Sequence, residues 1–149
     1  MHGYAIDPLL GPVVVLIAWT LVMMVWMAVT RLSAMKKAGI DLAKRRGGRG
    51  QNLEGVIPDE VNWKAHNYQH LMEQPTIFYA IVFSLILMGQ GLPINVWLAW
   101  GYVVLRIVHS IVQSTINFVP VRFSLFLLSS ICLIGLTVHA LAWVIGSLA

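Results

Sequence analysis

QPTIFYAIVFSLILMGQGLPINVWLAWGYVVL, residues 74–105, contains no charged side chain, yet Glu73 and Arg106 stand immediately at its two ends. A single transmembrane helix needs about 20 predominantly apolar residues, so this stretch is long enough to supply the inner parts of two neighbouring spans. The turn-forming segment GQGLP at 89–93 indicates where the chain reverses. Glu73 and Arg106 therefore lie inside predicted membrane helices, where ionisable side chains persist only when they are paired, hydrated or functional.

The composition extends this interpretation to the whole chain of 149 residues. It is 58% hydrophobic and 11% charged, whereas a soluble domain carries about 25% charged residues. We therefore expect a single integral membrane domain, surrounded by membrane lipids. The one cysteine, Cys132, excludes an intrachain disulfide. The net charge of +4 is no sign of a nucleic-acid partner, because the basic residues are concentrated in one segment.

Four apolar segments predict an all-α fold, a transmembrane four-helix bundle that forms one domain. We expect the break between the third and fourth spans at Val119-Pro120, because proline cannot continue a helical hydrogen-bond ladder. A soluble helical bundle is the alternative, but the long uncharged runs argue against it. The predicted spans are approximately 8–34, 63–89, 93–118 and 121–148, with a polar connection at 35–62.

The orientation of the bundle follows from its basic residues, because eight of the ten Lys and Arg fall within residues 31–64. Positively charged connections mark the cytoplasmic side, so we expect the 35–62 connection there and both termini on the opposite side. In a bacterium the membrane would be the inner membrane. Residues 1–7 carry no Lys or Arg, so we expect no cleavable signal peptide; His2 is expected to be disordered.

A polar stripe runs along the predicted third helix. Its members recur at spacings of 4, 3, 4 and 4 and fall within a sector of about 80°. Such a stripe cannot face lipid. It either joins helices by hydrogen bonds or lines a working cavity, which the arginine and histidine favour. The stripe consists of Tyr102, Arg106, His109, Gln113 and Asn117.

A second polar face lies on the predicted second helix, where His66, His70 and Glu73 are spaced i, i+4, i+7 and Asn67 flanks them. Glu73 and Arg106 lie at similar depths, about 15 and about 18 Å from the cytoplasmic ends of their helices. We predict an ion pair between these two residues that forms the floor of a pocket. A packing clamp without a chemical role is the alternative interpretation.

Two stretches carry a family resemblance: NYQHLMEQPTIFY at 67–79, and RIVHS at 106–110 followed by Pro120-Val121-Arg122. They are similar to the second helix of the MAPEG family, with its Asn-x-x-Glu and the Pro and Phe that follow, and to its Arg-x-x-His and Pro-x-Arg. This family includes microsomal glutathione transferases, leukotriene synthase and microsomal prostaglandin E synthase. The length, the four spans and the basic first connection agree with it as well.

The resemblance implies a homotrimer of four-helix bundles, with a glutathione site between subunits near the cytoplasmic side and lipophilic substrates that enter from the bilayer. Arg122 matches the family arginine thought to hold the glutathione thiol as a thiolate, which is the nucleophilic form. We therefore expect Arg122 to be catalytic. The residues expected to bind the cofactor are Arg31, His66, Asn67, His70, Glu73, Tyr102, Arg106, His109 and Gln113.

The chain departs from the glutathione-binding pattern at several positions. The arginine and asparagine of the family's Arg-x-x-x-Asn-x-x-Glu are His66 and His70 here. Gln113 replaces a tyrosine one turn after the helix 3 histidine, and Phe123 replaces a hydroxyl residue after the helix 4 arginine. Asn67 could compensate, or the thiol cofactor could differ.

Three functions stay open on these observations. The one we favour is a transferase or peroxidase that uses glutathione, or a related thiol, on lipophilic electrophiles, with no resident metal. The second is a metal-binding variant, because His66, His70 and Glu73 form a set that can ligate Fe(II) or Zn(II). The third is a lipid-binding or structural membrane protein of the same fold without enzymatic activity.

Overall fold

The computed structural model describes residues 6–44 and 46–148, and every regular element in this part of the chain is helical. The predicted all-α fold class is therefore confirmed. His2 and Arg45 lie outside the described residues. The elements are α1 (Leu10–Lys37), the short 3-10 helix η1 (Gly50–Leu53), α2 (Asp59–Leu87), α3 (Pro93–Thr115) and α4 (Val119–Leu148).

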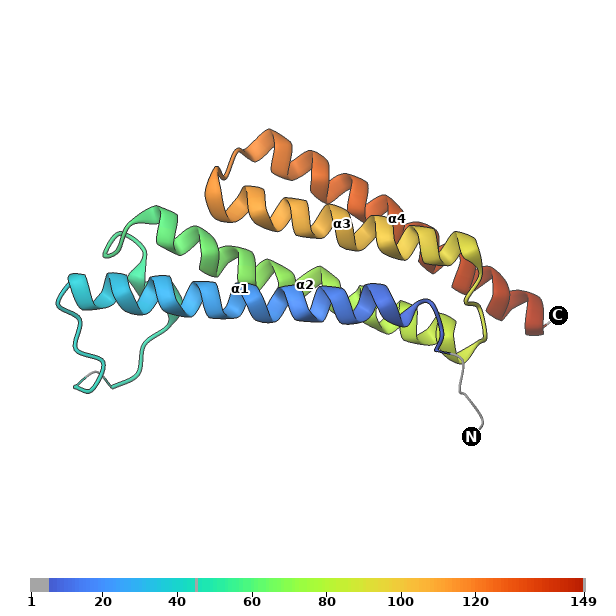
Figure 1. Cartoon of the computed structure of the whole chain (residues 1–149), viewed down its shortest axis with the longest axis horizontal. Helices are drawn as coiled ribbons and strands as arrows, with labels where there is room; N and C mark the ends of the chain where they lie inside the picture. The colour runs from blue at the N-terminus through green and yellow to red at the C-terminus, as the bar shows by residue number, and fades with distance from the viewer. Residues whose placement is uncertain (1–5, 45, 149) are drawn as a thin grey trace.

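The long helices run side by side, with α1 next to α2 and α3 next to α4 (Figure 1). The α2 and α3 helices each contact all three of the other long helices. The polar residues singled out in the sequence lie mainly on these two helices. Both chain ends and the α2–α3 turn lie at one end of the bundle, and the α1–α2 connection lies at the other (Figure 1).

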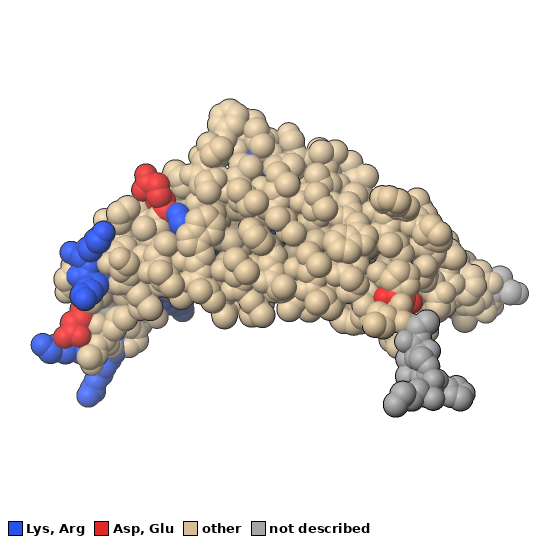
Figure 2. All heavy atoms as spheres, viewed as in Figure 1, with Lys and Arg blue, Asp and Glu red and all other residues tan. Residues whose placement is uncertain are grey.

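All four long helices are apolar and long enough to cross a membrane. The α1, α2 and α4 helices have 28, 29 and 30 residues. At 1.5 Å per residue they exceed the hydrocarbon core of a bilayer, which is about 30 Å thick. Figure 2 shows Lys and Arg gathered at the end with the α1–α2 connection, and a face free of charge along most of the bundle. The chain is an integral membrane protein.

The start of α2 differs from the predicted span, because the helix begins at Asp59 rather than near residue 63. Pro58 precedes it in an extended conformation, with ψ of 141°. Asp59 and Glu60 occupy the first turn, where acidic side chains complement the positive end of the helix dipole. Two charged residues thus belong to the helix although they lie outside the apolar run.

The break between α3 and α4 also differs from the prediction. The α3 helix ends at Thr115, and Asn117 adopts a left-handed φ of 51°, a conformation that asparagine tolerates better than most residues. Pro120 lies in the first turn of α4, which begins at Val119. A proline is favoured there, because the first turn leaves backbone N–H groups without helical partners. Pro120 therefore opens α4 rather than separating the two helices.

Small residues let α3 and α4 pack closely. A Cβ atom at Gly135 would lie 3.1 Å from Cδ1 of Leu98, and one at Gly101 would lie 3.3 Å from Sγ of Cys132. Close approach of helix backbones through small residues is a common way of joining helices in membranes. At these two positions glycine lets a side chain of the partner helix lie directly against the helix backbone.

We predict that Gly135→Val destabilises the protein by about 1–3 kcal/mol, the usual cost of overpacking a well-packed interior. The measurement is thermal unfolding in detergent. The control is Gly146→Val, also in α4, because nothing lies within 4 Å of a Cβ atom there. Equal stability of the two variants would show that the α3–α4 contact does not require glycine at position 135.

Candidate functional site

Arg106 is a fully buried guanidinium at the centre of the site, with 0% of its surface exposed. Its Nη2 atom donates a hydrogen bond to the backbone carbonyl of His70 at 2.9 Å and lies 3.1 Å from Nδ1 of the same residue. Tyr102, His109 and Gln113 are buried with it along α3. These four members of the polar stripe therefore face the interior of the bundle, as their spacing predicted, whereas Asn117 lies beyond the end of α3 and is half-buried.

The predicted ion pair between Glu73 and Arg106 is wrong within one subunit. Among the described residues, no salt bridge joins the two, and the side-chain hydrogen bonds of Arg106 go to His70. Glu73 is exposed on the surface of α2. The prediction matched their depths but not the rotation of α2, because Glu73 lies about 60° around the helix from His70.

A cavity of about 200 Å³ adjoins this contact, between α2, α3 and the start of α4. We call it the Arg122 cavity. The rings of His70 and His109 stack in it with centroids 5.0 Å apart, and the Phe126 ring lies 5.5 Å from that of His70. Its lining residues are His70, His109, Val119, Arg122, Phe123 and Phe126.

Arg122 is half-buried at the wall of this cavity. Its Nη1 atom donates to Oδ1 of Asn117 at 2.5 Å, so the left-handed residue that ends α3 also holds the arginine. A guanidinium in a partly apolar cavity attracts an anion more strongly than it does in water. Phe123 and Phe126 add an apolar wall. The arrangement suits a ligand with a negative reacting atom and a lipophilic partner.

Arg31 and His66 lie in a different place, around a cavity of about 270 Å³ beside the α1–α2 connection. We call it the Arg31 cavity. Nη2 of Arg31 donates to the Gly50 carbonyl at 2.8 Å, and Nε2 of His66 lies 3.1 Å from Oε1 of Glu54. The two cavities share no lining residue. Within one subunit, the predicted site therefore divides into two groups.

Three predicted site residues make contacts between helices or within the core. Asn67 is fully buried, and its Nδ2 atom donates to Oγ of Ser110 at 2.7 Å. The Tyr102 ring stacks on Phe78 with centroids 4.4 Å apart. Gln113 is 6% exposed. None of the three lines the Arg122 cavity. Asn67 and Tyr102 join helices within the subunit, whereas the side-chain oxygen of Gln113 has no hydrogen-bond partner among the described residues.

The metal hypothesis fails on the positions of its three residues. His66 is exposed and pairs with Glu54, His70 turns inward to Arg106, and Glu73 is exposed. No group of three His, Cys, Asp or Glu side chains that could hold a metal ion occurs in the described parts of the chain. The i, i+4, i+7 spacing placed the residues along α2 but did not bring their side chains together.

Sequence reasoning missed part of the cavity wall and the contact between His66 and Glu54. Val119, Arg122, Phe123 and Phe126 follow one another at i, i+3, i+4 and i+7, which is the pattern of a single helical face. That spacing could have placed the two phenylalanines beside Arg122. Glu54, by contrast, lies in the irregular connection, where no periodic pattern relates it to His66.

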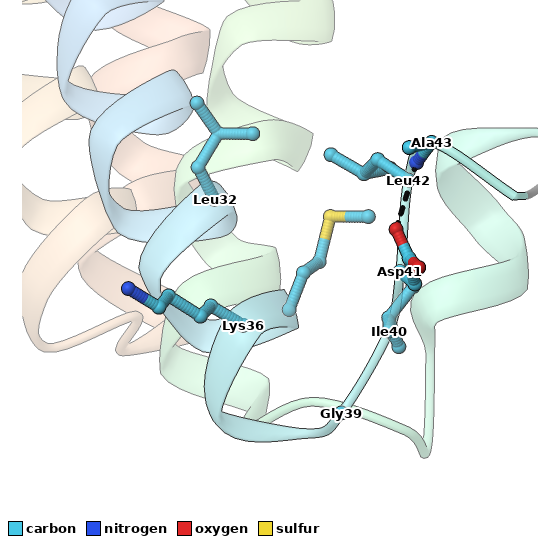
Figure 3. Close-up of a pocket in the computed structure, with 8 residues that line it drawn as sticks. Leu32, Lys36, Gly39, Ile40, Asp41, Leu42 and Ala43 are labelled. Carbon is cyan, nitrogen blue, oxygen red and sulfur yellow. Dashed lines mark hydrogen bonds between the residues drawn. The ribbon is translucent and has the colours of Figure 1, made fainter.

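A larger cavity of about 360 Å³ lies at the end of α1 (Figure 3). Its lining residues all come from the segment 32–43, the last turns of α1 and the chain that follows. Asp41 caps this chain locally, because its Oδ1 atom accepts from the Ala43 amide at 3.0 Å. The cavity at the end of α1 contains no predicted site residue and brings no distant elements together, so we do not assign it a function.

The comparison with protein families covers nearly all of the bundle. A family model described as the MAPEG family matches residues 9–142, from the residue before α1 into α4. No curated protein matches the chain, and no solved structure matches it.

We predict that Asn67 and Ser110 couple α2 to α3 by about 0.6–1.7 kcal/mol, the range measured for hydrogen bonds between membrane helices. A double-mutant cycle with Asn67→Ala and Ser110→Ala, followed by unfolding in detergent, gives this value. Additive effects of the two substitutions would show that the 2.7 Å contact contributes nothing to stability.

Proposed function

The chain belongs to the MAPEG family, and from this premise we propose that it is a membrane transferase or peroxidase. It uses glutathione, or a related thiol, on lipophilic electrophiles. The Arg122 cavity is the observation that carries the proposal, because it combines a guanidinium, two histidine rings and two phenylalanines. The cationic group suits a thiolate, and the aromatic wall suits a lipophilic co-substrate.

The described residues fit an anionic cofactor. Nε of Arg31, which lines the Arg31 cavity, is buried without a hydrogen-bond partner among the residues that the structure describes. Unpaired donors of this kind are costly, and carboxylates are their natural partners. Arg31 and His66 would hold the carboxylate end of glutathione, while Arg122 and His109 would line the thiol end.

Arg122 is the catalytic residue in this proposal. When bound, the cofactor supplies its thiolate as the nucleophile. The Arg122 guanidinium donates to the sulfur and lowers the pKa of the thiol, because a positive charge nearby favours the ionised form. Asn117 keeps the guanidinium in place, and Phe123 and Phe126 would lie beside a bound sulfur in the same cavity.

The exposed surface of α2 supports assembly with further copies of the chain. His66, Gln69, Glu73 and Thr76 are exposed and fall within about 80° of one another around the helix. We call this set the α2 polar stripe. Glu73 lies in the middle of α2, where an exposed charge would cost about 2.5–3.5 kcal/mol in hydrocarbon. A second copy that covers the stripe removes this cost.

The same stripe relates the two cavities to the assembly. His66 belongs both to the α2 polar stripe and to the Arg31 cavity, so a neighbouring subunit seated on the stripe also closes that cavity. We therefore propose a homotrimer, as the resemblance implies, with the cofactor held between subunits. The Arg31 group of one subunit then completes the Arg122 cavity of another.

The charges at one end of the bundle support the orientation that the sequence predicts. The α1–α2 connection would face the cytoplasm, and both termini would face the opposite side. The start of α4, whose first turn contains Arg122, lies at the cytoplasmic end in this orientation (Figure 1). In a bacterium the protein would lie in the inner membrane.

A non-enzymatic lipid-binding or structural role is the second candidate. This role is favoured by the contacts of Asn67 and Tyr102, which join helices rather than line a cavity. Binding of glutathione to the purified protein separates the two proposals.

We predict that Arg122→Leu lowers glutathione-dependent turnover of a lipophilic electrophile or hydroperoxide by about 100-fold or more, as loss of a charge-stabilising donor does in other enzymes. Arg122→Lys keeps part of the activity because it keeps the charge. The control is Arg46→Leu, since Arg46 is exposed in the connection. The non-enzymatic role would be supported instead if calorimetry detected no glutathione binding to the wild-type protein and the protein converted neither substrate.

We predict that Thr76→Trp, on the α2 polar stripe, breaks the trimer. The matched control is Ile134→Trp on the exposed apolar side of α4, where residue 134 is 61% exposed. Light scattering of the protein in detergent gives the mass of each variant. An unchanged trimer for Thr76→Trp, or a monomeric wild-type protein, would refute the proposed interface.

A further inference from the structure

We propose that Arg106 holds His70 in the Nε2-protonated, neutral form, and that this N–H is a second donor to the thiolate beside Arg122. The inference rests on the proposed function and concerns the same cavity. It assigns a binding role to His70 and a positioning role to Arg106, which acts through His70.

The contact between Arg106 and His70 uses both hydrogens of one nitrogen. Nη2 of Arg106 carries two N–H bonds, and it lies 2.9 Å from the His70 carbonyl oxygen and 3.1 Å from Nδ1 of the His70 ring. One hydrogen serves each acceptor. Arg106 is fully buried, so water does not compete for these hydrogens.

The chemistry of the two groups sets the position of the ring proton. A guanidinium donates hydrogen bonds and accepts none, so Nδ1 must be the acceptor and cannot carry a proton. The doubly protonated ring is excluded as well, because its Nδ1–H group would then point at the Nη2–H group of Arg106. The proton of His70 therefore lies on Nε2.

The surroundings of the ring direct this N–H into the Arg122 cavity. The ring is held between His109, at a centroid distance of 5.0 Å, and Phe126, at 5.5 Å. Nδ1 points to Arg106, and no described residue forms a hydrogen bond with Nε2. His70 lines the cavity together with Arg122. A sulfur atom held by the guanidinium thus meets a neutral donor on the neighbouring wall.

The two donors differ in what they contribute. Arg122 carries a full positive charge, whereas the neutral ring of His70 adds direction without adding charge. A hydrogen bond to the ionised form of a group favours that form. His70 therefore shifts ionisation of the bound thiol toward lower pH, and Arg106 ensures that the donating nitrogen is the one that faces the cavity.

Nitrogen NMR of the full-length protein in detergent, with labelled histidine, tests the tautomer without any ligand. The chain has five histidines, and His70→Asn identifies the signals of residue 70. We expect an Nε2-protonated neutral ring at neutral pH, and a measurably larger share of the Nδ1-protonated form in Arg106→Met. A ring protonated on Nδ1, or on both nitrogens, would overturn the proposal.

The second measurement is the ultraviolet absorbance of the glutathione thiolate bound to the protein, followed as a function of pH. In His70→Asn, the side-chain oxygen can still accept from Arg106, but no donor remains at the Nε2 position. We expect its thiolate fraction, at pH values below the ionisation midpoint, to fall about tenfold. Arg106→Lys can still donate a hydrogen bond to His70, so its thiolate fraction should fall less than that of His70→Asn.

His139→Asn is the control, because His139 is also half-buried in a membrane helix but bonds to Asn95 at 2.7 Å, away from the cavity. The inference would be overturned if the thiolate absorbance of bound glutathione varied with pH in the same way in His70→Asn as in the wild type. The proposed function would then still stand, provided that the wild type binds glutathione as a thiolate. A wild-type protein that binds no glutathione would remove the proposed function, and the thiolate contact of His70 with it.

Discussion

The buried guanidinium of Arg106 is the constraint on which the rest of the arrangement depends. A positive charge inside a membrane helix must find acceptors within the protein, and here they belong to His70. Bringing His70 toward α3 fixes the rotation of α2. That rotation turns Glu73, which looked like the counterion, to the outside of the subunit, where the proposed trimer would cover it.

The polar residues of the bundle fall into three sets because of this rotation. Asn67 and Tyr102 face inward and tie helices together or pack the core. His109 and Arg122 face the cavity between α2, α3 and α4. The α2 polar stripe faces outward, together with the Arg31 cavity beside the connection. In the proposed trimer, a cofactor with an anionic body and a reactive thiol would engage the second and third sets where two subunits meet.

Much of the fold could be predicted from the sequence, because apolar length and helical spacing are local properties. The four spans and the inward direction of the α3 stripe follow from them. The Glu73–Arg106 pair could not be predicted, since depth along two helices says nothing about their rotation about their axes. The helix ends at 115 and 119 depend on the left-handed Asn117 and on proline in a first turn. The helical spacing of α4 could have placed Phe126 beside Arg122. The contact between His66 and Glu54 depends on an irregular connection, where no such spacing applies.

The central claim is that the Arg122 cavity, with His70 held by Arg106, receives the sulfur of a thiol cofactor between subunits. An experimental structure of the full-length protein in a lipid bilayer with glutathione tests it most directly. The account predicts the sulfur within about 3.5 Å of both the Arg122 guanidinium and Nε2 of His70, with Glu73 covered by another subunit. A cavity filled by lipid chains, with Glu73 facing the bilayer and glutathione elsewhere, would contradict it.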